Sequence, residues 1–143
     1  MEKEEQLNIL VIDDEEEARE WLRRSLERRG YFVVTAGDGE EGLSKIKEFR
    51  AQIVICDIMM PKIDGIEFLE KARKYNLAVE IIMITGQSNL DSCVKAIENG
   101  ACGYLVKPVN IEDVLENISK AQRRIFEKKE MIQKALEREK DKS

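Results

Sequence analysis

The sequence predicts an α/β protein built on a parallel sheet, and two patterns support this prediction. Short apolar runs alternate with segments in which apolar residues recur every three or four positions. Such runs are typical of buried parallel strands, and such segments of amphipathic helices. Because the two kinds of element alternate, we expect one sheet with helices on both faces. A length of 143 residues is enough for one domain around a single core.

Five strands are expected, each followed by residues that end a strand. Their approximate ranges are 8–12, 31–35, 53–56, 79–84 and 102–106. The second strand leads into a turn at Gly37-Asp38-Gly39, and the third into a loop that contains Pro61 and Gly65. Pro108 ends the fifth strand, because proline cannot donate to the ladder of a central strand.

Five helices are expected after the strands, each with an apolar stripe facing the sheet. The residues expected to face inward are Ala18, Leu22 and Leu26, with Trp21 beside them, in the first helix, Leu43 and Ile46 in the second, and Val94 and Ile97 in the fourth. The third helix is expected at about 66–74. Ser88 and Asn110 are expected to cap the last two helices, and Gly100 to end the fourth.

The last helix is longer than a five-stranded sheet requires. Packing on the sheet needs about residues 111–121, but the helical pattern continues towards Glu139 without Gly or Pro. Apolar residues at the spacing of a coiled-coil seam continue with it, interrupted at Lys128. The seam consists of Ile111, Val114, Ile118, Ala121, Ile125, Ile132 and Ala135. We therefore expect a globular domain at 1–121 and a helical extension at 122–143, which either projects into a homodimer or another domain, or is a solvated tail.

Composition excludes several classes of function. The chain has no histidine, which excludes Ser-His-Asp and Cys-His nucleophile systems and histidine-containing zinc sites. It also excludes a phosphohistidine within the chain, so any phosphoryl group must come from another molecule. The three cysteines lack CxxC spacing and are expected to be free thiols.

Charge and hydropathy constrain location and partners. No apolar stretch approaches the ~20 residues of a membrane span, and the start of the chain lacks the features of a signal peptide. We therefore expect a cytoplasmic protein with no membrane partner. Residues 120–143 carry a net charge of +4 and the rest of the chain −9, so direct binding of nucleic acid is not expected.

Four of the expected strands end on residues that can handle a phosphoryl group. Asp13 and Asp14 follow the first strand, Asp57 the third, Thr85 the fourth and Lys107 the fifth. Because the carboxyl ends of parallel strands meet at one edge of a sheet, we expect these side chains to lie together.

This set of residues suits phosphoryl transfer to a carboxylate. Asp57 is the candidate nucleophile, which would form an acyl phosphate. Asp13 and Asp14 can hold Mg²⁺, while Lys107 adds a fixed positive charge and Thr85 a hydroxyl donor. Each residue also has a structural interpretation, as a helix cap, a loop cap, a strand end or a surface lysine. Their joint position at one edge favours the chemical interpretation.

Four segments around these residues resemble the receiver domains of two-component response regulators. They are Val11-Ile-Asp-Asp14, Ile55-Cys-Asp-Ile-Met-Met-Pro-Lys-Ile-Asp-Gly65, Ile84-Thr-Gly86 and Gly100-Ala-Cys-Gly-Tyr-Leu-Val-Lys-Pro108. The resemblance covers about residues 7–121. It implies a flavodoxin-like (βα)5 sandwich whose strands have the order 2-1-3-4-5.

The resemblance also implies a role for each site residue. Asp57 is implied to be the phosphoacceptor. The implied ligands of Mg²⁺ are Asp13, Asp14 and Asp57, with the backbone carbonyl of Met59. Lys107 is implied to bind the phosphoryl group, and its bond to Pro108 to be cis.

A switch and two kinds of partner follow from the same resemblance. Thr85 and Tyr104 are the implied switch pair, which reshapes the face of the fourth helix, fifth strand and last helix. Met59 and Gln87 flank the site, at positions that tune the lifetime of the acyl phosphate in this family. The implied partners are a sensor histidine kinase or phosphotransfer protein and a downstream effector protein or domain.

Two other functions would use some of the same features of the sequence. A haloacid-dehalogenase-type phosphatase uses a similar set of residues, but its nucleophile lies on the first strand in an Asp-x-Asp motif, whereas Asp57 follows the third. An interaction module would act through its last helix without phosphorylation. We expect instead a phosphoacceptor that catalyses its own phosphorylation and dephosphorylation, and not an enzyme with a separate substrate.

Overall fold

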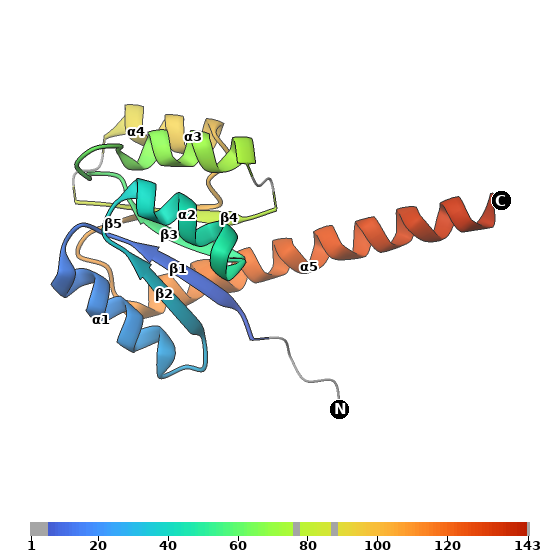
Figure 1. The fold of residues 1–143 in the computed structure, drawn as a ribbon, viewed down its shortest axis with the longest axis horizontal. Helices are drawn as coiled ribbons and strands as arrows, with labels where there is room; N and C mark the ends of the chain where they lie inside the picture. Colours follow the sequence, from blue (N-terminus) through green and yellow to red (C-terminus); the bar gives the residue numbers. More distant parts are fainter. Residues whose placement is uncertain (1–5, 76–77, 87–88, 143) are drawn as a thin grey trace.

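The computed structural model describes residues 6–75, 78–86 and 89–142. Strands and helices alternate throughout these ranges (Figure 1). In chain order they are β1 (Asn8–Ile12), α1 (Glu16–Glu27), β2 (Phe32–Ala36), α2 (Gly39–Phe49), β3 (Ile53–Asp57), α3 (Gly65–Tyr75), β4 (Glu80–Thr85), α4 (Leu90–Glu98), β5 (Gly103–Val106) and α5 (Ile111–Asp141). Two residues named from the sequence, Gln87 and Ser88, lie outside the described residues.

The five strands form one parallel sheet with the order β2-β1-β3-β4-β5. This confirms the predicted fold class and strand order. The central strands are apolar without alternation because both faces of the sheet are covered. In β3 and β4, every residue is buried.

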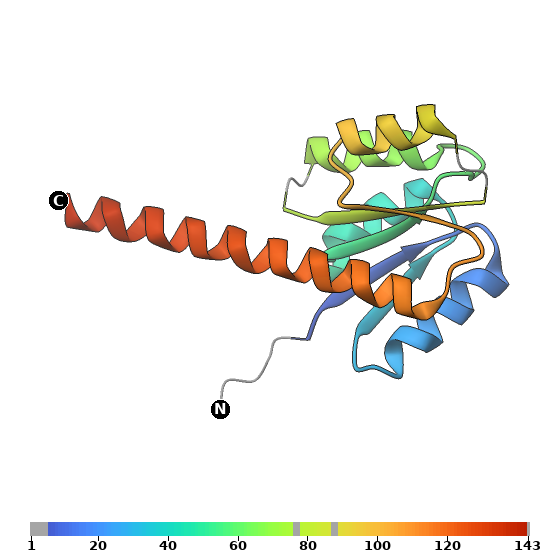
Figure 2. The ribbon, with the colours of Figure 1, turned by 180° about the vertical axis from the view of Figure 1, so that it is seen from behind.

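Helices cover the sheet on both sides (Figures 1 and 2). On one side, α2, α3 and α4 enclose a core that includes Ile46, Phe68 and Ala96. On the other side, α1 and α5 enclose a second core that includes Leu22 and Ile118. The site edge therefore lies on a sheet that is packed from both faces.

Side chains cap several helices. Asp38 accepts a hydrogen bond from the Glu41 amide at the start of α2, at 2.9 Å. Asn110 accepts one from the Asp113 amide at the start of α5, at 2.8 Å, which confirms the predicted cap. At α4 the cap is Asn89, not the predicted Ser88. Each cap satisfies a backbone amide that has no partner within its helix.

The predicted inward face of α4 is wrong. Val94 is 40% exposed and Ile97 is 62% exposed, whereas Ala96 is fully buried. The helix buries Ala96 against the core, and because Val94 and Ile97 lie on other sides of the helix, they point away from the sheet. Trp21 in α1 is likewise 45% exposed, while Leu22 beside it is buried, as predicted.

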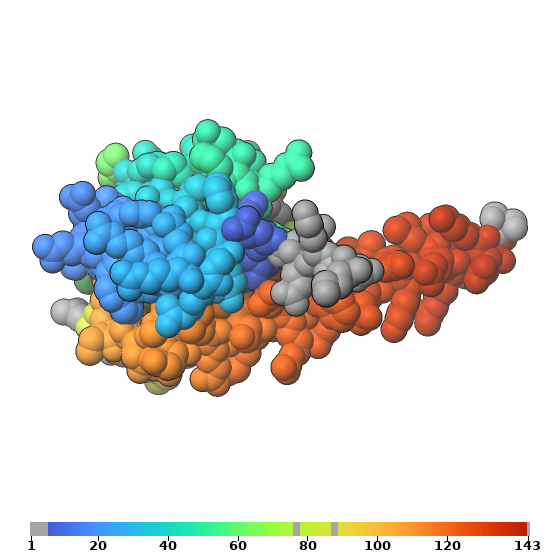
Figure 3. Space-filling model, turned by 90° about the horizontal axis from the view of Figure 1, so that it is seen from below, coloured from blue at the N-terminus to red at the C-terminus, as the bar shows by residue number. Residues whose placement is uncertain are grey.

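Helix α5 runs for 31 residues and projects beyond the sheet (Figures 1 and 3). Val114, Ile118 and Ala121 are fully buried against the sheet. The first half of the predicted seam therefore packs within the chain itself, and only the part beyond it, such as Ile132 at 60% exposure, is open. Across the described residues, we find no helix that is both long and apolar enough to cross a membrane.

Candidate functional site

The carboxyl ends of β1, β3 and β5 bring three aspartates and one lysine together. Oxygen atoms of Asp13, Asp14 and Asp57 all lie within 4.8 Å of one another. Asp13 and Asp57 are buried, at 7% and 4% exposure, and Asp14 is exposed. The arrangement agrees with the expectation that strand ends meet at one edge of the sheet.

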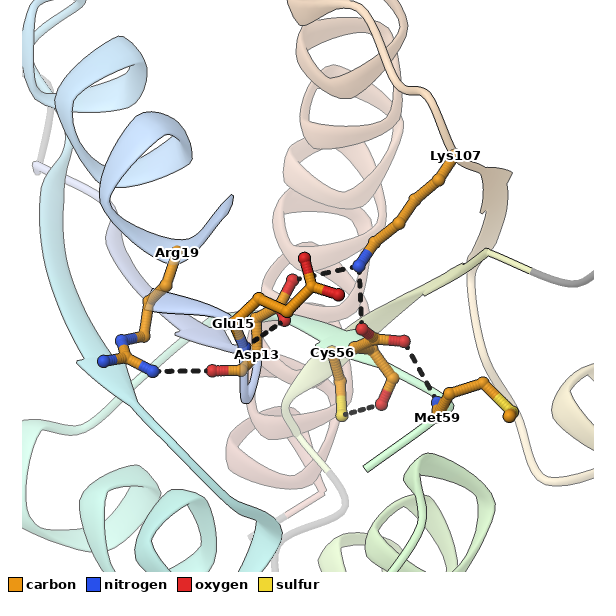
Figure 4. A network of polar contacts seen from close by, with 7 residues as sticks. Asp13, Glu15, Arg19, Cys56, Met59 and Lys107 are labelled. Atoms are coloured by element: carbon orange, nitrogen blue, oxygen red, sulfur yellow. Dashed lines mark hydrogen bonds and ion pairs between the residues drawn. The ribbon is translucent and has the colours of Figure 1, made fainter. Parts of the chain in front are cut away.

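The two carboxylate oxygens of Asp57 have different partners, Met59 and Lys107, both of which are labelled in Figure 4. Oδ1 accepts a hydrogen bond from the Met59 amide at 3.0 Å, and Oδ2 lies 2.8 Å from Nζ of Lys107. Lys107 also reaches Oδ2 of Asp13 at 3.3 Å. One ammonium group therefore bridges two carboxylates and partly balances their charge.

Asp13 is held through its backbone and its side chain. Its amide donates to the Ala36 carbonyl, and its Oδ1 accepts from the Glu15 amide at 2.9 Å. Its carbonyl accepts a hydrogen bond from Nη1 of Arg19 at 2.8 Å (Figure 4). Asp13 is thus fixed at the start of α1, but Glu15, not an aspartate, occupies the N-cap position.

Burial and charge act in opposite directions on the pKa values of this site. Burial raises the pKa of Asp13, more than the Glu15 amide and Lys107 lower it. Burial alone would lower the pKa of Lys107, but its hydrogen bond to Asp57 and the charges of Asp13 and Asp57 leave it raised. The lysine therefore stays charged at neutral pH. It lies between two carboxylates that repel each other when both are ionised.

The three aspartates suit a hard divalent cation. Carboxylate oxygens are the ligands that Mg²⁺ prefers, and the ion keeps several waters. Here two buried carboxylates are joined by the exposed Asp14, so the cluster is open to solvent on one side. The amide of Met59 donates to Asp57. That the carbonyl of Met59 is a further metal ligand stays a prediction.

The other predicted site residues lie on β4, on β5 and directly after β5. Thr85 ends β4 and is fully buried, and its carbonyl accepts the Lys107 amide at 2.8 Å. The bond between Lys107 and Pro108 is cis. Tyr104 lies on β5 opposite Met83 and packs on the core beneath α3 and α4. Its Oη atom is buried and has no hydrogen-bond partner among the described residues.

Sequence reasoning missed Arg19, a half-buried residue of α1 that belongs to no recognisable motif. It was not singled out because one arginine among many charged residues of α1 carries no signal of its own. Its five-residue separation from Asp14 places it on the second turn of the helix, where it reaches back to the Asp13 carbonyl. It therefore holds the loop that carries Asp13 through the backbone of that residue.

An apolar groove of about 470 Å³ adjoins the site. Asp13 and Lys107 form its wall towards the carboxylates, and Trp21, Pro108 and Val109 lie along the rest. Trp21 is the only tryptophan of the chain. Its fluorescence therefore reports on the surroundings of this site.

The fold and the site together define a class of protein: a doubly wound α/β domain with a carboxylate–lysine site at the carboxyl ends of its strands. The family model of the response regulator receiver domain matches residues 9–119. The chain belongs to the response regulator receiver domain family.

Known relatives and solved structures agree with this assignment. The alkaline phosphatase synthesis transcriptional regulatory protein PhoP of Bacillus subtilis is 39% identical over 116 residues, which are 81% of this chain and 48% of that protein. The crystal structure of a CheY-like receiver domain protein from Methanospirillum hungatei is 34% identical, with a TM-score of 0.83 over 86% of this chain and 98% of that one. The CheX–CheY–BeF3–Mg complex from Borrelia burgdorferi contains a chain that is 30% identical, with a TM-score of 0.75 over 78% of this chain and 86% of that one.

This chain covers only part of its curated relatives. It spans 48%, 26% and 51% of the lengths of three transcriptional or response regulators. The similarity therefore concerns the receiver domain, and not the other parts of those regulators.

Proposed function

We propose that Asp57 of this receiver domain accepts a phosphoryl group from a histidine kinase or phosphotransfer protein. The main observation is that Nζ of Lys107 lies 2.8 Å from Oδ2 of Asp57 while the carboxylates of Asp13 and Asp14 lie within 4.8 Å of that of Asp57. A nucleophile, a fixed cation and a set of metal ligands thus occupy one strand edge.

The transfer forms one bond and breaks one. An oxygen of the Asp57 carboxylate attacks phosphorus, and the bond between phosphorus and the donor breaks, with the electron pair leaving on the donor. The chain's own amide from Met59 fixes the orientation of the attacking carboxylate. Lys107 stays beside the product and offsets its additional negative charge.

Asp13, Asp14 and Asp57 are the residues that would hold Mg²⁺, together with the carbonyl of Met59. Bound there, the ion would reduce the repulsion between the attacking carboxylate and the incoming phosphoryl group. The open side next to Asp14 leaves space for water and phosphoryl oxygens. The Borrelia burgdorferi relative, which has this fold, is part of a complex with BeF3 and Mg.

Thr85 and Tyr104 are proposed as the switch that reports the phosphoryl group. Both lie on neighbouring strands, β4 and β5. Leaving the Tyr104 hydroxyl without a described partner costs free energy, which suits a ring that has a second position. The readout surface consists of α4, β5 and α5, where Val94, Ile97 and Val106 are exposed and apolar.

The proposed partners are a kinase or phosphotransfer protein and an effector that binds the readout surface, in the cytoplasm. The chain is proposed to act as a phosphoacceptor that catalyses its own phosphorylation and dephosphorylation.

A homodimer through α5 stays a prediction. Because Val114, Ile118 and Ala121 are buried within the chain, only the part of α5 beyond the sheet could form the interface. Sedimentation of wild type and Ile132→Glu at high concentration tests it, and a monomeric wild type contradicts it.

Intact-mass measurement tests the phosphorylation directly. Wild type is incubated with acetyl phosphate and Mg²⁺, and is expected to gain one phosphoryl group. Asp57→Asn should gain none, whereas Asp91→Asn, which changes an exposed aspartate on α4, should behave as wild type. If wild type gains nothing with any small donor, or Asp57→Asn gains as much, the proposal fails and an interaction module becomes the better function.

A further inference from the structure

The described part of the chain has four buried polar side chains, and one of them lies far from the site. Asp13, Asp57 and Thr85 lie at the carboxyl ends of their strands, where the candidate site is. The fourth is Glu80, which is only 1% exposed and begins β4. Glu80 thus lies at the end of β4 opposite to Thr85, where the phosphoryl chemistry gives it no role.

Two cations from α5 neutralise this carboxylate. Nε of Arg124 lies 3.1 Å from Oε2 of Glu80, and Nζ of Lys128 lies 2.5 Å from Oε1. Each oxygen of the carboxylate therefore has its own cation. A buried carboxylate without such partners would be strongly unfavourable, so the two pairs depend on α5 being in place.

The contact lies where α5 leaves the sheet. Arg124 and Lys128 are four residues apart and therefore lie on one side of the helix, one turn from each other. Between them, Ile125 packs against the core beneath α1 and α5. Contacts between α5 and the sheet thus continue past Ala121, the last fully buried residue of the helix. Lys128, which interrupts the apolar seam in the sequence, is directed to Glu80.

The strand that carries Glu80 is itself held from the other side. The guanidinium of Arg73 on α3 donates to the carbonyl of Val79, at 2.5 Å, and to that of Gly100, at 2.6 Å. It also donates to the Asn99 carbonyl at 3.3 Å. These hydrogen bonds connect the residue before β4 to α3 and to the residues that follow α4. The start of β4, which α5 contacts through Glu80, is therefore held in place from the opposite face of the sheet.

We propose that Glu80, Arg124 and Lys128 form a clamp that fixes the direction in which α5 leaves the sheet. Without it, the roughly twenty residues of α5 after Ala121 would have little tertiary packing, which is the main source of helix stability in proteins. With it, the first turns of the extension move with β4 as one rigid arm. Whatever the extension binds then has a defined orientation relative to the receiver domain, whether or not Asp57 is phosphorylated.

Hydrogen exchange in the full chain, measured by mass spectrometry, tests the clamp. The clamp variants are Lys128→Gln, Arg124→Gln with Lys128→Gln, and Glu80→Gln with both. The matched control is Lys134→Gln with Arg138→Gln, which removes two positive charges further along α5, at residues outside the clamp. We expect amides of residues 122–130 to exchange about tenfold faster in the clamp variants and as in wild type in the control.

The pattern across the chain decides the outcome. The clamp requires faster exchange in 122–130 with little change in β3 and β4. Unchanged exchange in 122–130 would overturn it. So would an equal rise in β4, because that result assigns the ion pairs to overall stability. In the triple variant Glu80 is also neutral, so no buried charge is left without a partner. If the double variant unfolds, exchange is measured in the triple variant instead.

Discussion

Nζ of Lys107 lies 2.8 Å from Oδ2 of Asp57, although the two residues are 50 positions apart in the chain. The same ammonium lies 3.3 Å from Asp13. A single lysine that follows β5 therefore balances two carboxylates, one directly after β1 and one at the end of β3. Its removal leaves the buried carboxylates of Asp13 and Asp57 without this cation, whose charge a bound metal ion would replace, and the effect can be measured.

Lys107→Met should lower the free energy of unfolding. We expect roughly 1–3 kcal/mol, less than for a fully buried pair, because 26% of the lysine side chain is exposed. Mg²⁺ should recover part of this loss, since it supplies the missing positive charge. Urea unfolding with and without Mg²⁺ measures both effects. Lys62→Met, which removes an exposed lysine paired with Asp38 at 3.4 Å, is the control and should change little.

Asp13→Asn should make the metal-free protein more stable at pH 7. Burial raises the pKa of Asp13 above its ordinary 3.8, so the folded state binds this proton more tightly than the unfolded state. The free energy of unfolding therefore falls as the pH rises from about the ordinary value through the raised one. Asn removes this fall. Thermal unfolding between pH 4 and 7 should show a flatter profile for the variant.

Mg²⁺ should reverse this order of stability. The ion favours ionised carboxylates, so it should stabilise wild type and have a much smaller effect on Asp13→Asn. Fluorescence of Trp21, which borders the site, provides an independent titration. Equal affinity for Mg²⁺ in both proteins would exclude Asp13 as a ligand.

Tyr104→Phe should leave stability unchanged or raise it by up to about 1 kcal/mol. The hydroxyl is buried without a described partner, and its removal relieves the cost of burying it. Tyr104→Ala, which also removes the ring, should instead cost roughly 2–3 kcal/mol. Urea unfolding of both variants separates the two contributions. A loss above about 1 kcal/mol in the Phe variant would reveal a partner for the hydroxyl.

Gly65→Ala should destabilise the fold and disturb Asp57. A Cβ at this position would lie 2.6 Å from both the Asp57 carbonyl oxygen and the Ile58 Cα, which are backbone atoms that cannot rotate away. We expect a loss of about 1–3 kcal/mol and slower phosphorylation by acetyl phosphate. Gly86→Ala is the matched control, because its nearest neighbour would be Cδ of Lys107 at 3.9 Å. Its stability should stay within about 0.5 kcal/mol of wild type.

Local patterns predicted much of the fold. Apolar runs ending on polar residues located all five strands to within a residue or two, and side-chain caps such as Asn110 located helix starts. These signals are local, because strands and caps depend on near neighbours in the chain. Burial on α4 was mispredicted at Val94 and Ile97, because several faces of a helix can be apolar and only the packing selects one.

By itself, the sequence determined the class of this protein: alternating elements, and Asp13, Asp14, Asp57 and Lys107 at strand ends that meet in any such sheet. Only the tertiary structure decided that one ammonium group bridges Asp57 and Asp13. It also decided that Lys128 turns back to Glu80. The physical reason is that periodicity records which residues are apolar, whereas a pair of buried charges depends on distances between segments far apart in the chain.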